Sequence, residues 1–465
     1  MSVRDTVERM LRPLRLIVLL PLACHAIAAV AETAAVRGVA SAVPAFENAW
    51  PQWRGPLANG FAPRANPPIH WSETNNIRWK IALPGKGHSS PIVFGDRVYV
   101  LSAAPTGPAQ KPVFDDAPGV HDSVPVTQRH QFLALAINRR DGKISWQKVL
   151  REEWPHEGGH ETGSLASNSP VTDGECLYAF FGSRGLYCLD LNGELKWQKD
   201  LGRMHTLHAH GEGSSPVLHG DTLIVCWDHE TEAGSFLCAI DKRTGKTLWK
   251  VPRDEKTSWS TPLVVEFEGK PHVIVSATKR VRGYDLATGA QLWECAGLTD
   301  NVVSSPVYYR DKGIVIAGNS YYSQAMVAIR LAGAKGDVTG TDRVAWKLNR
   351  LTPYVSSPLL YGDTLYFLRH NQNVLSRLDP ATGKPRGEPL RLEGINDFIF
   401  SSPVGAGGRI YITGRDGNTV VLRHDRENAV LALNHLEDSF SASAAMADRE
   451  FYLRGERFLY CIAEP

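Results

Sequence analysis

Short apolar runs alternate with polar turns along most of the chain, and residues 214–249 contain one complete example of the pattern. An apolar run over 216–227 is broken once, at Gly220-Asp221, which is a hairpin dipeptide. A second run covers 236–241, and a third ends at Trp249 after a Thr-Gly turn. Glycine tolerates the positive φ that such turns need. The pattern therefore predicts four short antiparallel strands, A to D, joined by hairpins.

This unit recurs along the chain, and each copy opens with a pair of small, mostly polar residues that is usually followed by Pro. From the second copy onward the steps are 46, 46, 44, 52, 45 and 42 residues, and the first step is 79 because the first unit carries an insertion. A period in the forties with four strands per unit is typical of a β-propeller. The sequence therefore predicts an all-β chain that forms a single eight-bladed β-propeller of four-stranded antiparallel blades. The eight copies are Ser89-Ser90-Pro91, Asn168-Ser169-Pro170, Ser214-Ser215-Pro216, Ser260-Thr261-Pro262, Ser304-Ser305-Pro306, Ser356-Ser357-Pro358, Ser401-Ser402-Pro403 and, in altered form, Ser443-Ala444-Ala445.

Strand C and strand D of most units share an eleven-residue run of the form Ala-x-Asp-x-x-Thr-Gly-x-x-x-Trp, which is clearest over 239–249. An aromatic plate buries about 150–250 Å². One Trp at a fixed place in each blade is therefore interpreted as a packing device between blades. The sixth unit keeps the turn over 378–383 and lacks the Trp. The tryptophans assigned to this structural role are Trp79, Trp146, Trp197, Trp249, Trp293 and Trp346.

The last unit, which follows Ser443, contains three strands, and an outer strand is available ahead of the first unit at residues 77–83. We expect residues 77–83 to complete the eighth blade, so that the ring closes without an exposed sheet edge. The propeller would then span residues 77–465. Residues 32–76 form an N-terminal extended segment, and its part from 50 to 76 is expected to lie across the outside of the ring.

The N-terminus has the features of an export signal, with Arg4, Arg9, Arg12 and Arg15 ahead of an apolar run over 16–23. Ala29-Val30-Ala31 offers a cleavage site, so residues 1–31 are predicted to be a signal peptide and the protein to be periplasmic. Lipid attachment at Cys24 is the alternative. The apolar run is too short to span a bilayer, so no transmembrane segment is expected.

Net charge and cysteine spacing exclude several function classes. The formal net charge is +2, which gives no reason to expect a nucleic-acid surface. No Cys-x-x-Cys occurs, so zinc-ribbon and thioredoxin-like sites are excluded. Cys176 with Cys188, and Cys226 with Cys238, could form disulfides between neighbouring strands or remain buried thiols, and both possibilities stay open.

Candidate chemistry gathers in the loops at one face, because the D-to-A loops and the B-to-C loops of a propeller share a side. His88 precedes the first strand A, Trp259 takes the same place in the fourth unit, and the insertion over 103–130 could act as a lid. Three imidazoles with a carboxylate would suit Zn²⁺ or another divalent metal. The same histidines could act as general bases or be solvated loop residues, so three interpretations stay open. The metal candidates are His205, His208 and His210, and the other ligand-face candidates are Glu157, His160, Glu212 and Asp228.

The run over 239–249 is similar to the tryptophan-docking motif of the eight-bladed propellers of the quinoprotein alcohol dehydrogenase-like superfamily. The opening Trp50-Pro51-Gln52-Trp53-Arg54-Gly55-Pro56, with Gly87-His88-Ser89-Ser90-Pro91, resembles exported proteins with PQQ-binding-like β-propeller repeats. The same superfamily contains the outer-membrane assembly factor BamB. The resemblance covers about residues 50–465 and implies the fold strongly and the activity weakly.

The resemblance implies two kinds of function. Quinoprotein dehydrogenases carry a vicinal disulfide against pyrroloquinoline quinone (PQQ), whereas this chain has no Cys-Cys pair and no Cys-x-x-Cys-His haem site. We therefore expect an exported scaffold that binds a protein partner, a polysaccharide or a small molecule at the propeller face. Peripheral association with the outer membrane would fit such a role. The alternative is an enzyme on the histidine-rich face that is metal-dependent, carbohydrate-active or, less in keeping with these residues, PQQ-dependent.

Overall fold

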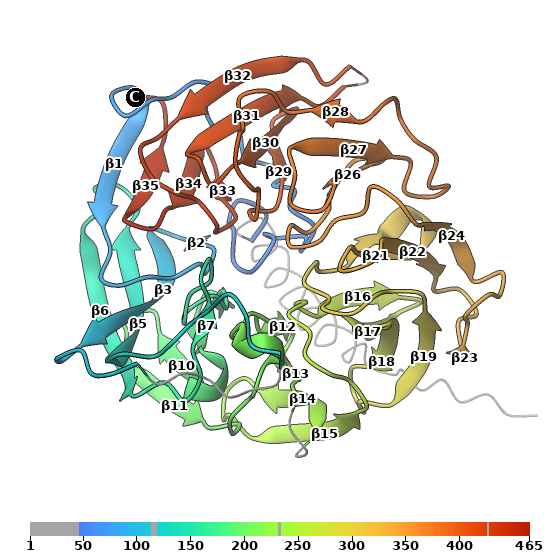
Figure 1. Ribbon diagram of the computed structural model, residues 1–465, viewed down its shortest axis with the longest axis horizontal. Helices are drawn as coiled ribbons and strands as arrows, with labels where there is room; N and C mark the ends of the chain where they lie inside the picture. Colours follow the sequence, from blue (N-terminus) through green and yellow to red (C-terminus); the bar gives the residue numbers. More distant parts are fainter. Residues whose placement is uncertain (1–45, 113–118, 231–233, 426) are drawn as a thin grey trace, which may run out of the picture. The chain divides into compact units, whose positions relative to one another are not determined.

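Eight antiparallel sheets are arranged around a common centre in the computed structural model (Figure 1). The structure describes residues 46–112, 119–230, 234–425 and 427–465, which belong to one compact unit. The eight-bladed all-β propeller expected from the repeat is thus confirmed. The predicted signal peptide and Cys24 lie outside the described residues. None of the described helices has the length and hydropathy of a membrane span.

In each blade the strands run from the centre of the ring to the rim in the order A, B, C, D. The first four blades contain, in turn, β2 (Ile92–Phe94), β3 (Arg97–Thr106), β5 (Arg129–Asn138) and β6 (Ile144–Glu153); β8 (Val171–Thr172), β9 (Cys176–Phe180), β10 (Leu186–Asp190) and β11 (Leu195–Lys199); β12 (Val217–His219), β13 (Thr222–Trp227), β14 (Ser235–Asp241) and β15 (Thr247–Arg253); and β16 (Leu263–Phe267), β17 (Lys270–Ala277), β18 (Arg280–Asp285) and β19 (Gln291–Ala296).

The remaining blades follow the same order. Blades five to eight contain, in turn, β20 (Val307–Tyr309), β21 (Ile314–Asn319), β22 (Ala325–Arg330) and β24 (Val344–Leu348); β25 (Leu359–Tyr361), β26 (Thr364–Leu368), β27 (Val374–Leu378) and β28 (Leu390–Arg391); β29 (Val404–Ala406), β30 (Arg409–Thr413), β31 (Asn418–Arg423) and β32 (Val430–His435); and β33 (Ala445–Ala447), β34 (Glu450–Arg454), β35 (Phe458–Ile462) and β1 (Ile77–Ala82).

A few short elements lie outside this scheme. Strand β23 (Gly336–Asp337) adds a parallel fifth strand to blade four, and β4 (Ser123–Val124) pairs with β7 (Gly159–His160) above the ring. The 3₁₀ turns are η1 (Gly182–Arg184), η2 (Leu207–Ala209) and η3 (Arg310–Lys312).

The eighth blade is closed by β1, as expected from residues 77–83. Strand β1 pairs antiparallel with β35, with Trp79 opposite Cys461. Across the same junction, Arg139 of blade one pairs with Glu450 and Asp448 of blade eight. The closure therefore joins the first and the last blades of the propeller both by a strand ladder and by ion pairs between blades.

The innermost strands are linked by a ring of hydrogen bonds between backbone N–H groups and hydroxyls. From Ser90 to Ser402, each N–H donates to the hydroxyl of the next blade at 2.9–3.1 Å, which gives seven links, and Ser90 Oγ accepts no such bond from the described residues. The last link joins Ser402 to Ser443, which are 41 residues apart. The eighth copy of the phrase is therefore Ala442-Ser443-Ala444, one residue earlier than the expected alignment, because the link needs a hydroxyl at this place. The members in order are Ser90, Ser169, Ser215, Thr261, Ser305, Ser357, Ser402 and Ser443.

Most of the named tryptophans contact the strand-C-to-strand-D turn of the following blade. The Trp249 indole N–H donates to the carbonyl of Leu286 at 2.8 Å, and a Cβ on Gly289 would lie 2.7 Å from the ring. A side chain at that glycine would therefore collide with the plate. Trp79, Trp146, Trp197 and Trp346 make the same two kinds of contact with the next blade.

Trp293 departs from this arrangement. Its ring is 1% exposed and lies against Gly283 of its own blade, and within the described part of the chain its indole N–H has no hydrogen-bond partner. The following blade replaces the short turn by a longer loop, from which Leu331 and Val338 pack in the same apolar cluster as Trp293. Trp293 is therefore a buried core residue without the bond to the next turn.

Residues 46–76, which we call the strap, pair with the inner edges of several blades. Trp50 and Val93 exchange backbone hydrogen bonds at 2.9 and 2.8 Å. Ala62 donates to Gly405 of β29 at 2.9 Å. An inner strand has one unpaired edge, and the strap satisfies part of that edge.

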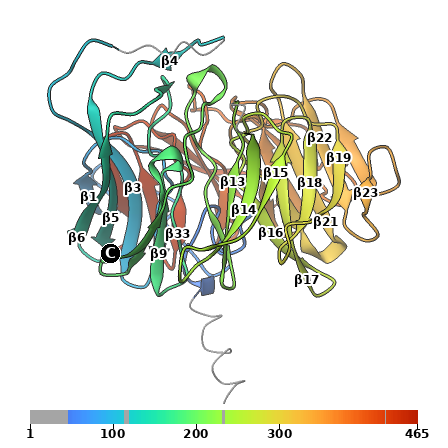
Figure 2. The same cartoon turned by 90° about the horizontal axis from the view of Figure 1, so that it is seen from below.

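The strap also closes one end of the central channel. The Arg54 guanidinium donates to the carbonyls of Pro403 and Pro358 at 2.8 and 2.6 Å, and the Trp53 indole donates to Ser305 Oγ at 3.3 Å. Figure 2 shows the strap, in blue, at the end of the ring opposite β4. The expectation that residues 50–76 lie across the outside is thus wrong for residues 50–62, because unpaired carbonyls near the axis bind this segment.

The described cysteines are free thiols. Cys176 and Cys188 lie on the neighbouring strands β9 and β10, and Cys226 and Cys238 lie on β13 and β14. Burial raises the pKa of the Cys188 and Cys238 thiols, the latter to about 12. A raised pKa keeps a thiol protonated and unreactive at neutral pH.

Candidate functional site

The end of the channel opposite the strap, which we call the loop end, encloses a cavity of about 630 Å³. The D-to-A and B-to-C loops form its walls, and the strap residue Trp53 reaches its lining from below. Such a volume is within the range of about 300–1,000 Å³ of small-molecule sites. The hydroxyl-bearing ring residues that line it are Ser169, Ser215, Thr261, Ser305, Ser357 and Ser443.

The two sides of this cavity differ in chemistry. Blades one to three contribute imidazoles, namely His88, His121, His160 and His210. Blades five to seven contribute aromatic rings, namely Tyr321, Tyr354, Phe398 and Phe400. The cavity therefore offers hydrogen-bonding groups on one side and flat apolar surfaces on the other.

His88 lies at the start of strand A in blade one, as expected, and lines the cavity. Its backbone N–H donates to Ser164 Oγ at 2.9 Å, while its ring Nε2 is buried and has no hydrogen-bond partner among the described residues. Burial first, and then the nearby charges of Lys86, Arg454 and Arg415, lower the pKa of His88 to about 3. The ring is therefore neutral at physiological pH and a weak base.

Four histidines gather where residues 119–128, which we call the arm, meet the loop around η2. Ring centroids of His121 lie 4.4 Å from His208 and 5.0 Å from His210, and His160 lies 4.6 Å from His210. His208 Nδ1 is 2.7 Å from the carbonyl oxygen of Gly119, and His210 Nε2 is 3.0 Å from that of His121. Burial lowers the pKa of His210 to about 4. These rings hold the arm to the loop.

The three histidines considered as metal ligands do not form one group. His205 is directed to Glu157, with Nδ1 3.4 Å from a carboxylate oxygen, and its ring centroid lies 5.4 Å from that of His156. His208 and His210 belong to the cluster at the arm. Across the described residues, no three His, Cys, Asp or Glu side chains are arranged to hold a metal ion. The structure thus gives the metal hypothesis no support.

The acidic candidates are engaged in holding loops. Glu157 accepts hydrogen bonds from the backbone N–H of Thr206, at 3.0 and 3.1 Å, and from its hydroxyl. Asp228 and Arg253 form an ion pair at 2.8 Å in which both side chains are 0% exposed. Asp228 therefore does not reach the cavity, whose lining does not include it.

Glu212 borders the cavity and is also bonded to the protein. It accepts from the Arg184 guanidinium at 2.8 Å and from the backbone N–H of Ser183 at 2.6 Å. Burial raises the pKa of the Glu212 carboxyl. Trp259 lines the cavity as well, and its indole N–H donates to the carbonyl of Gly211 at 2.6 Å. Both side chains are therefore fixed in place by neighbouring loops.

Sequence reasoning missed Arg415, Trp53 and His121 in the lining. The Arg415 guanidinium lies 5.3 Å from the Phe400 ring centroid, a cation–π arrangement. Arg415 belongs to the B-to-C loop of blade seven, so the rule that these loops share a face could have found it. Trp53 could not be found in this way, because only the strap's path through the ring brings it to the cavity.

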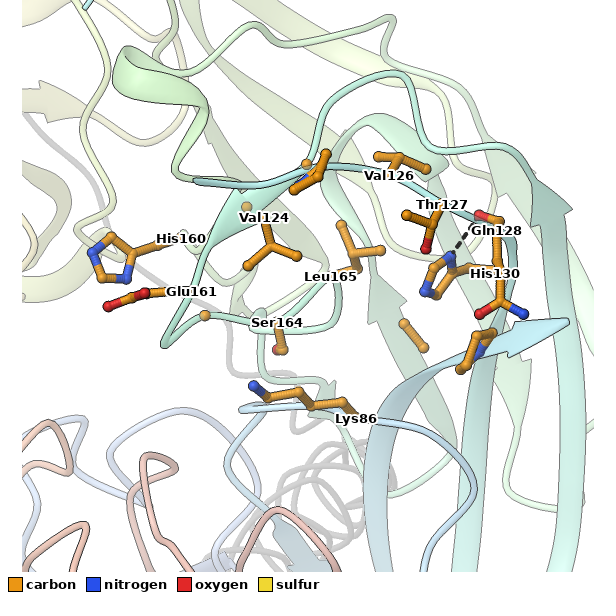
Figure 3. Close-up of a pocket in the computed structure, with 16 residues that line it drawn as sticks. Lys86, Val124, Val126, Thr127, Gln128, His130, His160, Glu161, Ser164 and Leu165 are labelled. Atoms are coloured by element: carbon orange, nitrogen blue, oxygen red, sulfur yellow. Dashed lines mark hydrogen bonds between the residues drawn. The ribbon is translucent and has the colours of Figure 1, made fainter. Parts of the chain in front are cut away.

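A smaller side chamber of about 270 Å³ opens beside the cavity (Figure 3). Val124 and Val126 of the arm lie over it, with Leu165 and Lys86 on the other side. The chamber shares His160 with the main cavity. An apolar part of a bound molecule could extend under the arm.

PQQ carries three carboxylates, and the described lining of the main cavity does not fit it. The described lining contains Arg415 together with the carboxylates of Asp122, Glu161 and Asp397, and the carboxylate of Glu212 is paired with Arg184. The described cysteines lie in strands and none lines the cavity. The charges here favour a neutral or weakly charged ligand.

Comparisons with known proteins agree with the architecture. The family model described as outer membrane protein assembly factor BamB matches residues 66–227 and 192–430. Subunit 1 of methanol dehydrogenase (cytochrome c) from Methylobacterium organophilum is 25% identical over 202 residues, which cover 36% of this chain and 30% of that protein. The match thus spans less than a third of this relative.

Two solved structures match over most of their own length. A europium-containing methanol dehydrogenase has a TM-score of 0.50 at 11% identity, covering 89% of this chain and 91% of its own. BamB from Moraxella catarrhalis has a TM-score of 0.49 at 14% identity, covering 77% of this chain and 97% of its own. The family model extends over most of the propeller described above, and the chain therefore belongs to the family of PQQ-like β-propellers described as outer membrane protein assembly factor BamB.

Proposed function

We propose that the protein is a non-catalytic scaffold of the bacterial envelope that binds a protein partner at the loop end of the propeller. The observation that carries the proposal is that the polar and the aromatic side chains of the cavity make different contacts. Its carboxylates and imidazoles mostly hold loops together, whereas Tyr354, Phe398 and Phe400 face the cavity as flat apolar surface. Aromatic side chains dominate the energetics of protein interfaces.

The exposure of the loop end supports a protein partner. Phe398 is 53% exposed and Tyr322 is 87% exposed, and both lie in loops of the aromatic side. A partner segment could cover these rings and insert a side chain into the cavity below. The family description, an outer membrane protein assembly factor, supports the same kind of role.

Site-specific crosslinking tests the proposal. A photoreactive amino acid at Phe398 or Tyr322 is expected to capture one discrete partner in cells, identified by mass spectrometry. The same amino acid at Leu248, which is 54% exposed on the rim strand β15, is the matched control. Crosslinks only from Leu248, or none from either loop position in cells that contain the folded protein, would overturn the proposal.

The proposed location is the periplasm, with peripheral association at the outer membrane, because residues 1–31 have the pattern of an export signal. N-terminal sequencing of the protein recovered from cell fractions checks both points. A mature N-terminus at Glu32 in the soluble periplasmic fraction or washed from outer membranes is the expected result. A lipidated Cys24 would instead give a protein that only detergent releases.

An enzymatic role would require a reactive group in the same cavity. His88 is the candidate, since its ring Nε2 is buried there and no described residue forms a hydrogen bond with it. Metal analysis of the purified protein, titration with PQQ, and comparison of His88→Ala with the unmodified protein on polysaccharide substrates would test it. Turnover that depends on His88 would replace the scaffold proposal.

A further inference from the structure

The inner hydroxyls that line the loop-end cavity have a hydrogen-bonding capacity that the described protein does not use. Each of these side chains is at most 7% exposed, and its oxygen accepts a backbone N–H of the preceding blade. A hydroxyl also carries one hydrogen that it can donate. None of these hydroxyls donates to a described residue, whereas Ser214 and Ser401 donate to the carbonyls of Ser260 and Thr413. The hydroxyl-bearing residues are Ser169, Ser215, Thr261, Ser305, Ser357 and Ser443.

Other donors in the same lining are also without acceptors in the described part of the chain. The Arg415 guanidinium lies 5.3 Å from the Phe400 ring centroid and forms no ion pair with a described residue. Arg415 Nε and Ser441 Oγ are buried, and no described residue forms a hydrogen bond with either. The Asn371 side chain uses its oxygen to accept the backbone N–H of Val355, and its Nδ2 donates to none of the described residues. The inner part of the cavity is therefore rich in donors.

Acceptors lie closer to the solvent. Glu161 and Asp397 line the cavity and are exposed, and neither forms an ion pair within the described ranges. Asp397 accepts only the backbone N–H of its neighbour Phe398, at 2.6 Å. A ligand in this cavity therefore meets hydroxyl donors near the axis and carboxylate acceptors near the mouth.

Aromatic rings supply the third part of the lining. The ring centroids of Phe398 and Phe400 lie 5.9 Å apart with an interplanar angle of 10°. Those of Tyr321 and Tyr354 lie 5.7 Å apart with an angle of 27°. The face of an aromatic ring is electron-rich, so it attracts polarised C–H bonds. This side of the cavity favours a ligand that has an apolar C–H face.

The three parts of the lining exclude several classes of ligand. A purely apolar molecule would bring no acceptors to the buried hydroxyls. An anion would meet the carboxylates of Asp122, Glu161 and Asp397, with Arg415 as the cation of the described lining. A simple cation would have no acceptor for the inner donors. A neutral sugar ring meets all three requirements, because its hydroxyls both accept and donate and its C–H bonds form an apolar face.

We propose that the loop-end cavity binds one neutral hexopyranose residue, either as a free sugar or as the end of a glycan. The volume of about 630 Å³ is within the range of small-molecule sites. Because the strap closes the other end of the channel, a glycan reaches the inner hydroxyls only with its terminal residue. The site goes beyond the proposed partner role, in which a protein covers the exposed rings at the mouth, and the two experiments can fail independently.

Titration of the purified full chain with sugars, followed by isothermal calorimetry and saturation-transfer difference NMR, tests the proposal. The panel contains glucose, galactose, mannose and N-acetylglucosamine, and the disaccharides maltose, lactose, cellobiose and chitobiose. At least one neutral sugar is expected to bind with one-to-one stoichiometry. Similar affinities for a monosaccharide and its disaccharide would identify a free sugar as the ligand. A disaccharide affinity higher by about tenfold, or about 1.4 kcal/mol, would identify the end of a glycan.

Two conservative variants test the aromatic and the acidic parts of the site. Phe400→Leu removes the flat ring and keeps an apolar side chain, so it is expected to weaken binding about fivefold. Asp397→Asn removes a charged acceptor and is expected to weaken binding about tenfold. Asp96→Asn is the matched control, because Asp96 is 81% exposed between β2 and β3 and does not line the cavity. It is expected to leave the affinity unchanged.

The outcomes against the proposal are specific. Absence of binding by the whole panel at about 20 mM, well above a millimolar Kd, would overturn the site. Glucuronate has the ring of glucose and an added carboxylate, so tighter binding of glucuronate than of any neutral sugar would overturn the ligand class. Unchanged affinity in both Phe400→Leu and Asp397→Asn, or equal weakening by Asp96→Asn, would overturn the location, provided that the circular dichroism spectra are unchanged.

Discussion

At the rim between two blades lies a slot, which is the space that a docked tryptophan fills. The contact between blades three and four and the contact between blades six and seven differ in what occupies this slot. In the first, Trp249 covers Gly289 and donates to Leu286. In the second, a cavity of about 570 Å³ lies beside Arg377. One slot is closed by an apolar plate, and the other remains polar and accessible to solvent. A repeat fold can therefore omit the packing tryptophan at one contact and keep a polar cavity in its place.

The largest effect is expected from removing a plate. Trp249→Ala leaves a void against Gly289 and is expected to lower the free energy of unfolding by about 3–5 kcal/mol. Urea denaturation followed by circular dichroism measures it. Leu248→Ala, at the neighbouring exposed position, is the control and is expected to change stability by less than about 0.5 kcal/mol. Equal losses for the two variants would contradict the packing role of the plate.

A smaller effect is expected at the polar cavity between blades six and seven. Arg377→Ala removes the hydrogen bonds that the guanidinium donates to Asn428 Oδ1 and to the carbonyl of Glu388. We expect a loss of about 1.5–3 kcal/mol, the usual range for hydrogen bonds made by a charged group. The same urea experiment compares it with Trp249→Ala. A loss as large as that of the tryptophan variant would mean that the slot is a packing contact after all.

The inner ends of the two contacts are expected to behave alike. Thr261 Oγ1 accepts the backbone N–H of Ser215 at 3.0 Å between blades three and four, and Ser402 Oγ accepts that of Ser357 at 2.9 Å between blades six and seven. Thr261→Val and Ser402→Ala each remove the accepting hydroxyl and are each expected to lose about 0.5–1.5 kcal/mol. Equal losses would confine the difference between the contacts to the rim. A Ser402→Ala loss well below that of Thr261→Val would extend the difference to the axis.

The smallest effect is a pH dependence that only the polar contact should show. Burial lowers the pKa of His424, so the unfolded chain binds a proton at this residue before the folded protein does. The folded protein should therefore lose stability as the pH falls below about 6.5, the pKa of an unperturbed His. Replacing His424 by Gln should reduce the loss between pH 7 and pH 5. An unchanged loss in that variant would show that other groups cause it.

Much of the fold could be predicted because its physical cause is local. Hairpin glycines, alternating apolar runs and the phrase before strand A depend on neighbouring residues, so they can be recognised in the sequence. The predicted position of the last copy of the phrase is one residue too late. Ala442, Ala444 and Ala445 are identical residues on both sides of Ser443, so the sequence does not define the register there. The hydrogen bond from Ser402 to Ser443 resolves the register.

The sequence predicted where the candidate site lies but not which side chains come together in it. His88, His160, His210, Glu212 and Trp259 all line the loop-end cavity. His205 and Asp228 do not, because each is turned to a partner that lies far from it in the sequence or in a neighbouring loop. The spacing of residues in a loop does not determine which way their side chains point. His205 is directed to Glu157, so the three predicted histidines do not form one group.

The sequence by itself determined the number of blades, their strand order and the strand that closes the ring. These features follow from short-range periodicity, repeated at nearly constant intervals. The tertiary structure decided the path of the strap at the end of the channel and the gathering of His121 with histidines distant in the sequence. It also decided that a polar cavity remains beside Arg377. Each of these depends on which unpaired donor or acceptor lies nearest in space, and that distance is set only when all eight blades have closed into the ring.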